Sequence, residues 1–347
     1  MKFFNLSSKQ IFSQFICLLI IFQLISSAMI MRRKKNKLKR VTPTHSLKIG
    51  IYSWNVGEQD PPKDLSKFAS KDNDVIAVGL QETVKLGLKN IVFSDNEIKK
   101  EYHLWETRIK EELNKHGKYS VLEFKNTRWL VGISLFLFIK DGLKKEVTEL
   151  EGMRIKTGVH GLLGNKGSVN ARFKFGAKSY SFSCVHLTAG DESHSERMKE
   201  LNELFEKKYS KCNKLVKDHD VQIVFGDLNS RTDYSSSNKA AENEQTKQKI
   251  HSQDFSFFKN DQLHKALAES VLKGMKEGEI KFAPTYKFDP NTDNYDTSKK
   301  QRIPSWCDRV IYRDTAVMKN AQKVYTNIPE LKMSDHKPIY SEFHIPV

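Results

Sequence analysis

The chain has 347 residues, of which 58 are Lys or Arg and 42 are Asp or Glu, so the formal net charge is +16. Nine of the basic residues lie within residues 1–40, which hold no acidic residue, and the rest of the chain keeps a net charge of about +7. Such a charge attracts polyanions in general and does not choose among nucleic acid, anionic lipid and other acidic ligands. The four cysteines show neither a CxxC pair nor a metal-ligand spacing, which argues against a disulfide framework and favours reduced thiols.

The first forty residues read as a separate segment. Residues 10–31 carry no charge, and these 22 residues are just long enough to span a bilayer. They include the strongly apolar stretch Phe15–Ile25. Seven basic residues follow within residues 32–40. They resist translocation and attract anionic lipid, so we expect a membrane anchor with the following domain in the cytoplasm. The alternatives are a signal peptide cleaved after Ala28, which would give a secreted protein, and a basic run that is only a linker or a nuclear-localisation-like cluster.

Residues 41–347 alternate short apolar runs with turns and form one expected domain. The apolar runs predict strands at Leu47–Trp54, Val75–Leu80, Leu130–Ile139, Ser168–Phe175, Tyr180–Leu187, Val221–Phe225 and Arg309–Tyr312. Helices are expected at Asn96–Lys115, Glu192–Lys217 and Gln262–Met275, and a loop or short helix at Tyr234–Ser252. Strands outnumber helices and partly follow one another as hairpins. This favours packed sheets with helices outside over a doubly wound parallel sheet.

The polar residues suited to catalysis stand at the ends of these strands. They are Asn55, Glu82, His186 and the run Gly226-Asp-Leu-Asn229. Strand ends at one edge of a sheet form a rigidly supported, concave site. Backbone alternation places Asp227 and Asn229 on the same side, where they can address one water, although an isolated Asp-x-Asn is common in turns.

A second pattern joins two distant motifs. Ile303-Pro-Ser-Trp-Cys-Asp-Arg309 opens one strand, and Ser334-Asp-His-Lys-Pro338 precedes another. Asp308 and His336 are therefore candidates for an Asp–His pair in which the carboxylate fixes the imidazole tautomer. Cys307 and Arg313 have the C-x5-R spacing of cysteine phosphatases, but the bulky residues between them read as strand and cannot wrap a phosphate. Cys307 is expected to be a packed thiol.

The ordered motifs resemble those of inositol polyphosphate 5-phosphatases. They are Trp54-Asn-Val, Gly79-Leu-Gln-Glu82, Thr157-Gly158 with Gly164-Asn-Lys-Gly167, His186-Leu-Thr-Ala-Gly190, Gly226-Asp-Leu-Asn-x-Arg231, Pro284-Thr-Tyr-Lys-Phe-Asp289, Pro304-x-Trp-Cys-Asp-Arg309 and Ser334-Asp-His-Lys-Pro338. The resemblance extends from Gly50 to Phe343. It implies an α/β fold, the deoxyribonuclease-like four-layer sandwich of two mostly antiparallel sheets flanked by helices.

The resemblance also implies a reaction and its catalytic residues. The reaction is Mg²⁺-dependent hydrolysis of the 5-phosphate of phosphatidylinositol phosphates or soluble inositol polyphosphates, without a phosphoenzyme. Glu82 with Asn55 would hold the metal, and Asp227 would be the general base with Asn229 orienting the water. His336, held by Asp308 and helped by His186, would stabilise the phosphoryl oxygens, and Asp335 would support the metal or the phosphate.

The same resemblance points to residues that bind substrate. These are Asn165, Lys166, Tyr286, Lys287, Lys300, Arg302 and Arg309, of which Tyr286, Lys287, Lys300 and Arg302 would surround the 4-phosphate. Leu162 and Leu163 match a position that dips into lipid, and ordinary packing is the alternative for them. The chain departs from the family pattern at Val224 and Ser230, usually aromatic, and at His160, often glycine, so the preference for lipid or soluble substrate stays open.

Two other functions remain in view. A nuclease of the same superfamily would use the same catalytic residues, and the basic domain suits DNA. The motifs around Tyr286-Lys287 and Lys300-x-Arg302 favour ring phosphates instead, so we expect no nucleic-acid partner. A non-catalytic, basic membrane adaptor would have lost at least one catalytic group, and none is missing.

Overall fold

The computed structural model describes residues 46–68, 72–85, 95–124, 127–157, 163–234, 238–270 and 272–347. The predicted anchor and basic run within residues 1–40, and the loop residues His160 and Leu162, lie outside this range. The anchor, the domain boundary at residue 40 and the lipid contact therefore stay predictions. None of the helices in the described ranges combines the length and apolar character needed to cross a bilayer.

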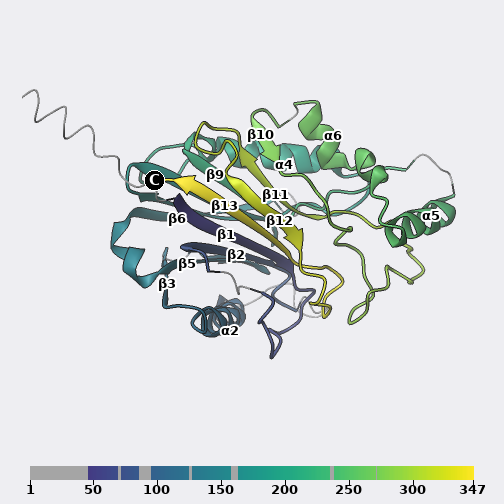
Figure 1. Cartoon of the computed structure of the whole chain (residues 1–347), viewed down its shortest axis with the longest axis horizontal. Helices are drawn as coiled ribbons and strands as arrows, with labels where there is room; N and C mark the ends of the chain where they lie inside the picture. The colour runs from purple at the N-terminus through teal and green to yellow at the C-terminus, as the bar shows by residue number, and fades with distance from the viewer. Residues whose placement is uncertain are drawn as a thin grey trace, which may run out of the picture. The chain divides into compact units, whose positions relative to one another are not determined.

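Two mixed β-sheets form the centre of the domain (Figure 1). The first sheet has the order β12 (Gln322–Asn327), β13 (Ile339–Pro346), β1 (Ser46–Asn55), β2 (Val75–Gln81), β5 (Ile133–Lys140) and β3 (Tyr119–Val121), with β4 (Trp129–Leu130) also on β5. The second has the order β10 (Met275–Glu277), β11 (Asp308–Arg313), β9 (Val221–Asp227), β8 (Lys178–His186), β7 (Leu163–Phe175) and β6 (Val147–Thr157). Only the β1–β2 and β8–β9 pairs are parallel among these strand pairs.

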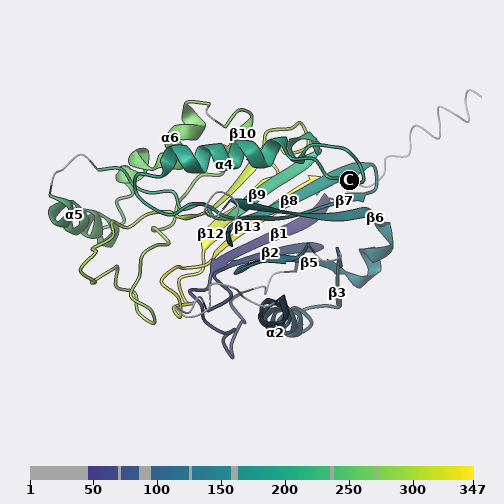
Figure 2. The ribbon, with the colours of Figure 1, turned by 180° about the vertical axis from the view of Figure 1, so that it is seen from behind.

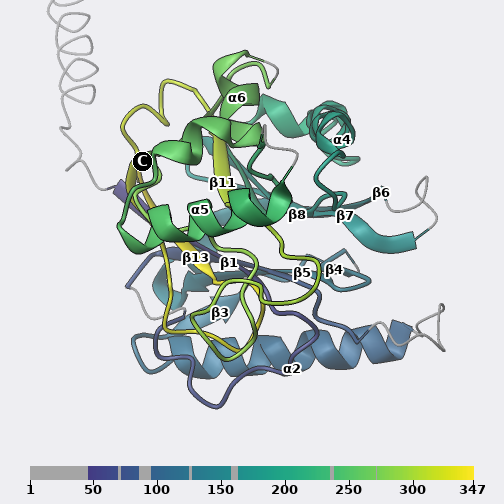
Figure 3. The ribbon, with the colours of Figure 1, turned by 90° about the vertical axis from the view of Figure 1, so that its right-hand side faces the viewer.

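Helices cover the outer faces of both sheets. The α-helices are α2 (Asp95–Leu113), α4 (His194–Glu206), α5 (Lys239–His251) and α6 (Gln262–Ala268), and short 3₁₀ turns are η1 (Asp141–Glu146), η2 (Val216–Asp218) and η3 (Ser256–Asn260). Apolar residues of α2 pack on the first sheet, and those of α4 and α6 on the second. Figure 3 shows the four layers end on, and Figure 2 shows α4 lying along the second sheet. The predicted four-layer α/β sandwich is confirmed.

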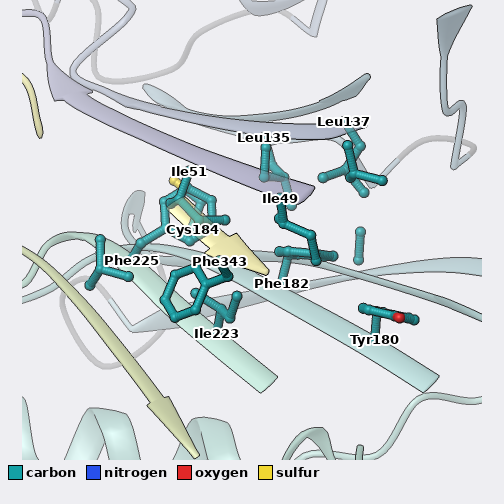
Figure 4. Packing of buried hydrophobic residues seen from close by; sticks show 14 of the residues in the cluster. Ile49, Ile51, Leu135, Leu137, Tyr180, Phe182, Cys184, Ile223, Phe225 and Phe343 are labelled. Atoms are coloured by element: carbon teal, nitrogen blue, oxygen red, sulfur yellow. The ribbon is translucent and has the colours of Figure 1, made fainter. Parts of the chain in front are cut away.

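The alternation of side chains along the strands builds the core. In β1, Ile49 and Ile51 join the cluster between the sheets, whereas Tyr52 and Trp54 join the cluster beneath α2. Figure 4 shows Ile49 and Ile51 facing side chains of the second sheet. The sheets approach closely at Gly79, because a Cβ there would lie 2.6 Å from the Cys184 Sγ. Each face of β1 is therefore buried, which explains its nearly continuous apolar sequence.

Two predicted helices are shorter in the structure than expected, and edge strands were not predicted. The helix predicted at 262–275 ends at Ala268, and Met275 begins strand β10. The helix predicted at 192–217 ends at Glu206, and a loop closed by a bridge between Lys208 and Leu215 follows. For 234–252, where a loop or a short helix was expected, the helix is confirmed, since α5 occupies Lys239–His251. The strands β6 and β12 were not predicted, because both are edge strands with few buried side chains and lack a clear apolar run.

Candidate active site

Strand register brings the polar strand ends together. Asn55 at the end of β1 pairs with Gln81 of β2, directly before Glu82. In the second sheet His186 pairs with Asp227, and Asp227 pairs with Asp308 at the start of β11. Because parallel strands end at the same edge, these residues from distant motifs meet at one end of the sandwich.

Asn55 links two carboxylates across the two sheets. Its Nδ2 donates to Glu82 Oε1 and to Asp227 Oδ2, each at 3.0 Å. Its Oδ1 accepts the backbone N–H of Gly57 at 3.1 Å. In this orientation Asn55 presents its amide nitrogen to both carboxylates, so it fixes Glu82 against Asp227.

Asp227 lies buried between two imidazoles. Its Oδ2 is 3.3 Å from His186 Nε2 and 3.9 Å from His336 Nε2. Burial disfavours the charge of the carboxylate, but His336, His186 and Lys166 hold the pKa of Asp227 well below its ordinary value. Asp227 is therefore ionised at neutral pH and can accept a proton.

The loop after Asp227 is fixed by two backbone conformations. Gly226 has φ +141°, and a Cβ there would lie 2.1 Å from the Val185 carbonyl oxygen, so only glycine fits. Asn229 is left-handed at φ +50° and donates its backbone N–H to Asp227 Oδ1 at 2.9 Å. Its Nδ2 donates to the Leu187 carbonyl at 3.0 Å. The aspartate and the asparagine are thus held on one side of the loop.

His336 and Asp308 form the expected pair. His336 Nδ1 is 2.9 Å from Asp308 Oδ2, and that oxygen also accepts the Thr285 hydroxyl at 2.6 Å. Burial works against the charged imidazolium, but the charges of Asp308 and Asp227 and the hydrogen bond to Asp308 raise the pKa of His336 to about 10. The ring is therefore a cation at neutral pH, and its Nε2 side faces Asp227.

The acidic groups at this end fit a hard divalent cation. Glu82 directly follows β2 with φ +53°, and its side chain is 36% exposed beside the buried Asp227. Carboxylate oxygens with room for water are the ligands that magnesium prefers. A second group, Asp227, Asp308 and His336, has possible ligand atoms within 4.8 Å of one another. All three residues are buried, and Asp308 Oδ2 already contacts His336 Nδ1 and accepts the Thr285 hydroxyl. Glu82 is the better candidate.

The predicted substrate-binding residues lie at different distances from this centre. Lys166 contacts His186 Nε2, and the Tyr286 ring packs against His336 with centroids 4.5 Å apart. Lys287 donates to Asp335 Oδ2 at 2.6 Å. Asn165 is half-buried near the start of β7, and Lys300 is exposed. Arg302 Nη1 is 3.5 Å from an oxygen of Asp191.

The structure corrects the prediction for Arg309. Its side chain is fully buried and forms ion pairs with Asp261 at 2.7 Å and with Glu277 at 2.5 Å. Asp261 in turn accepts the hydroxyl of Ser230, which follows Asn229, at 2.8 Å. Arg309 cannot reach a ligand, and instead it connects β11, β10 and the start of α6 to the loop that follows Asp227, the predicted base.

Sequence reasoning missed three residues near the centre. Arg231 donates to Asn229 Oδ1 at 2.5 Å and stacks over the Tyr286 ring at 4.5 Å. Asp191 and Lys239 pair at 3.0 Å close to Arg231. The Gly-Asp-Leu-Asn-x-Arg motif could have identified Arg231. Asp191 and Lys239 stand outside the motifs, and only the folded chain brings them to the site.

The two packed sheets define the fold class of the chain, and the comparison with a family model then gives its family. The fold is the deoxyribonuclease-like two-sheet sandwich that the motifs predicted. The chain belongs to the family described as Endonuclease/Exonuclease/phosphatase family 2, which it matches over residues 52–342.

Curated relatives and a solved structure narrow the resemblance. The chain is 31% identical over 315 residues to polyphosphatidylinositol phosphatase INP53 of Saccharomyces cerevisiae, covering 88% of this chain and 27% of that protein. It is 35% identical over 303 residues to phosphatidylinositol 4,5-bisphosphate 5-phosphatase INP51 of the same yeast, covering 84% and 30%. The inositol polyphosphate 5-phosphatase domain of SpSynaptojanin, solved with inositol (1,4)-bisphosphate and calcium, matches with TM-score 0.75 and 28% identity, covering 92% of this chain and 89% of that one.

These matches confirm the resemblance to inositol polyphosphate 5-phosphatases. The chain spans between about a fifth and a third of the length of several curated relatives that it matches. The similarity therefore concerns the domain that contains the cluster of Asn55, Glu82, Asp227, Asp308 and His336.

Proposed function

We propose that this protein is a phosphoric monoester hydrolase that removes the 5-phosphate from phosphatidylinositol phosphates or soluble inositol polyphosphates. The observation that carries the proposal is the position of Tyr286. Its ring packs on His336 at 4.5 Å, and the next residue, Lys287, lies within 5.8 Å of that ring. A cationic, aromatic wall thus adjoins the catalytic carboxylate, which suits a ring that bears several phosphates.

The described residues can carry out a direct transfer to water. Asp227 accepts a proton from a water whose oxygen attacks phosphorus, and the bond between phosphorus and the inositol oxygen breaks. The departing alkoxide takes a proton from solvent or from His336, and the products are inorganic phosphate and an inositol with one phosphate fewer. His336 as imidazolium donates to a phosphoryl oxygen, and Asp308 holds its ring. Lys166 adds positive charge on the other side of Asp227, where it contacts His186.

Magnesium is the cation that we assign to Glu82. Bound there, Mg²⁺ would polarise the scissile phosphate and neutralise its charge. Asn55 keeps Glu82 in place through the 3.0 Å hydrogen bond from its Nδ2. The calcium-bound SpSynaptojanin domain is consistent with a divalent cation in this fold.

The direct test compares two phosphoesters. The purified protein should release inorganic phosphate from 4,5-bisphosphorylated inositides, soluble and lipid-embedded, and should lose this activity when a chelator removes magnesium. Supercoiled plasmid DNA under the same conditions should stay intact. Nicking of DNA without phosphate release would replace the phosphatase with the rival nuclease, and neither activity would favour the non-catalytic adaptor.

A further inference from the structure

Three cations converge on one carboxylate beside the centre. Asp191 Oδ2 is 3.0 Å from Lys239 Nζ and 3.5 Å from Arg302 Nη1. Its other oxygen is 3.9 Å from Arg231 Nη1. The cations come from the first residue of α5, the loop before β11 and the loop of the base. One carboxylate cannot neutralise three cations, so the group keeps an excess of positive charge.

This cation group lies one guanidinium away from the catalytic loop. Arg231 donates to Asn229 Oδ1 through Nη2, while its Nη1 faces Asp191. The same guanidinium stacks over Tyr286, whose ring packs on His336. The Arg231 guanidinium thus bridges Asn229, two residues after Asp227, and Asp191. A ligand whose reacting phosphate meets Asp227 can therefore extend a second phosphate toward Asp191 and its cations.

The helix that carries Lys239 is held by polar contacts. α5 buries only Asn243 and Thr246, and Lys247 Nζ donates to the carbonyl of Asp296 at 3.1 Å. The Asp296 carboxylate accepts the backbone N–H of Arg302 at 2.8 Å. Lys239 and Lys247 are eight positions apart, so both lie on the face of α5 that is turned to the loop that carries Arg302. Figure 3 shows α5 across this end of the sandwich.

The contact of Lys239 with Asp191, and that of Lys247 with Asp296, hold the start of α5 beside the catalytic centre. The Lys239 side chain is 31% exposed, and that of Asp191 is 25% exposed. A phosphate group can replace the Asp191 oxygen as the acceptor for Lys239 and Arg302, because it offers more charge and more acceptor oxygens than one carboxylate. Asp191 then serves to keep the two cations together while the site holds no ligand.

We propose that Lys239 is a specificity-determining residue that, together with Arg302, binds a phosphate on the ring carbon next to the one that is hydrolysed. The inference rests on the proposed phosphatase function and adds α5 and Asp191 to its substrate site.

The test is the ratio of kcat/KM for two substrates in the Lys239→Ala variant. One substrate carries phosphates at positions 4 and 5, and the other carries only the 5-phosphate, each as the free inositol phosphate and as a short-chain lipid. Loss of one charge-assisted contact should lower the 4,5-to-5 ratio by about tenfold. Lys239→Arg should keep the ratio within about threefold of the unmodified protein, since it keeps the charge.

Lys249→Ala is the matched control, because Lys249 is an exposed lysine in the last turn of the same helix. It should leave the ratio unchanged. A fall in either substrate form supports the proposal and identifies the form that Lys239 reads. An unchanged ratio, or an equal loss on both substrates, overturns the proposal while the phosphatase function stands. No phosphate release by the unmodified protein would overturn the phosphatase function and this inference with it.

Discussion

At the scale of single residues, Asp227 is a buried carboxylate whose pKa the neighbouring His336, His186 and Lys166 hold well below its ordinary value. The Asp227→Asn substitution keeps its shape and can still pair with Asn55, but an amide cannot accept the proton of the attacking water. We expect kcat for phosphate release to fall by about a thousandfold or more, and substrate affinity to change little. Steady-state kinetics and a direct binding titration of the same inositide measure the two effects.

The control for this substitution is Asp218→Asn, which changes an exposed aspartate in η2 by the same atoms. It should leave kcat and affinity as they are. Turnover by Asp227→Asn close to that of the unmodified protein would show that another group is the base.

His336 offers a prediction about pH. Its pKa of about 10 in the folded chain lies above the ordinary 6.5. The ion pair with Asp308 therefore stabilises the fold fully below about pH 6.5, and this stabilisation is lost as pH rises through about 10. In chelator-treated protein, NMR of labelled histidines should show the His336 ring protonated at pH 8.

The Asp308→Asn substitution tests the cause of this shift. It removes the nearest negative charge, so the pKa of His336 should fall toward the ordinary histidine value. A His336 ring in the unmodified protein that titrates near pH 6.5 would contradict the assignment of a buried imidazolium.

At the scale of elements, Arg309 holds two strands and a helix around the base loop. Arg309→Met leaves Asp261 and Glu277 as buried charges without their partner. We expect the free energy of unfolding to fall by about 3 to 5 kcal/mol, measured by urea denaturation. Lys281→Met removes one partner of an exposed pair with Glu279, and it should leave the unfolding midpoint nearly unchanged. Equal, small effects of the two substitutions would refute a structural role for Arg309.

The sequence was sufficient to predict a strand and the site residue at its end wherever an apolar run was followed directly by a polar residue. The runs before Asn55, Glu82 and Asp227 are buried strands, and their register brings these side chains within hydrogen-bonding distance. The pairing of Asp308 with His336, 28 residues apart, followed from their motifs and is present at 2.9 Å.

The sequence was insufficient to predict elements and side chains whose positions depend on polar contacts. α5 buries two polar residues and no apolar stripe, so periodicity did not identify its length or its role. Arg309 belongs to a motif, and the motif could not show that its guanidinium turns inward to Asp261 and Glu277. The contact between Asp191 and Lys239 joins residues 48 positions apart that share no pattern.

At the scale of the whole molecule, each sheet contributes one half of the site. The first sheet supplies Asn55 and Glu82, and the second supplies His186, Asp227 and Asp308, so closure of the sandwich assembles the centre. α5 lies at the end of the sandwich opposite the chain's C-terminus (Figure 1). A substrate therefore meets α5 and the strand ends at one end of the domain.

The last prediction concerns residues 1–40. A domain that acts on phosphorylated lipid would benefit from attachment to a membrane. The apolar stretch would supply insertion, and the seven basic residues after it would supply attraction to anionic lipid. We expect the full chain, tagged at its C-terminus and expressed in cells, to sediment with membranes and to resist extraction by salt and alkali. A chain of residues 41–347 should remain in the supernatant and still release phosphate from a soluble inositide. Replacing the seven basic residues of 32–40 by glutamine should lower the fraction of molecules whose domain faces the cytoplasm. A protease-protection assay measures this fraction. Cleavage between Ala28 and Met29 with secretion of the tagged domain would contradict the anchor and support the signal peptide.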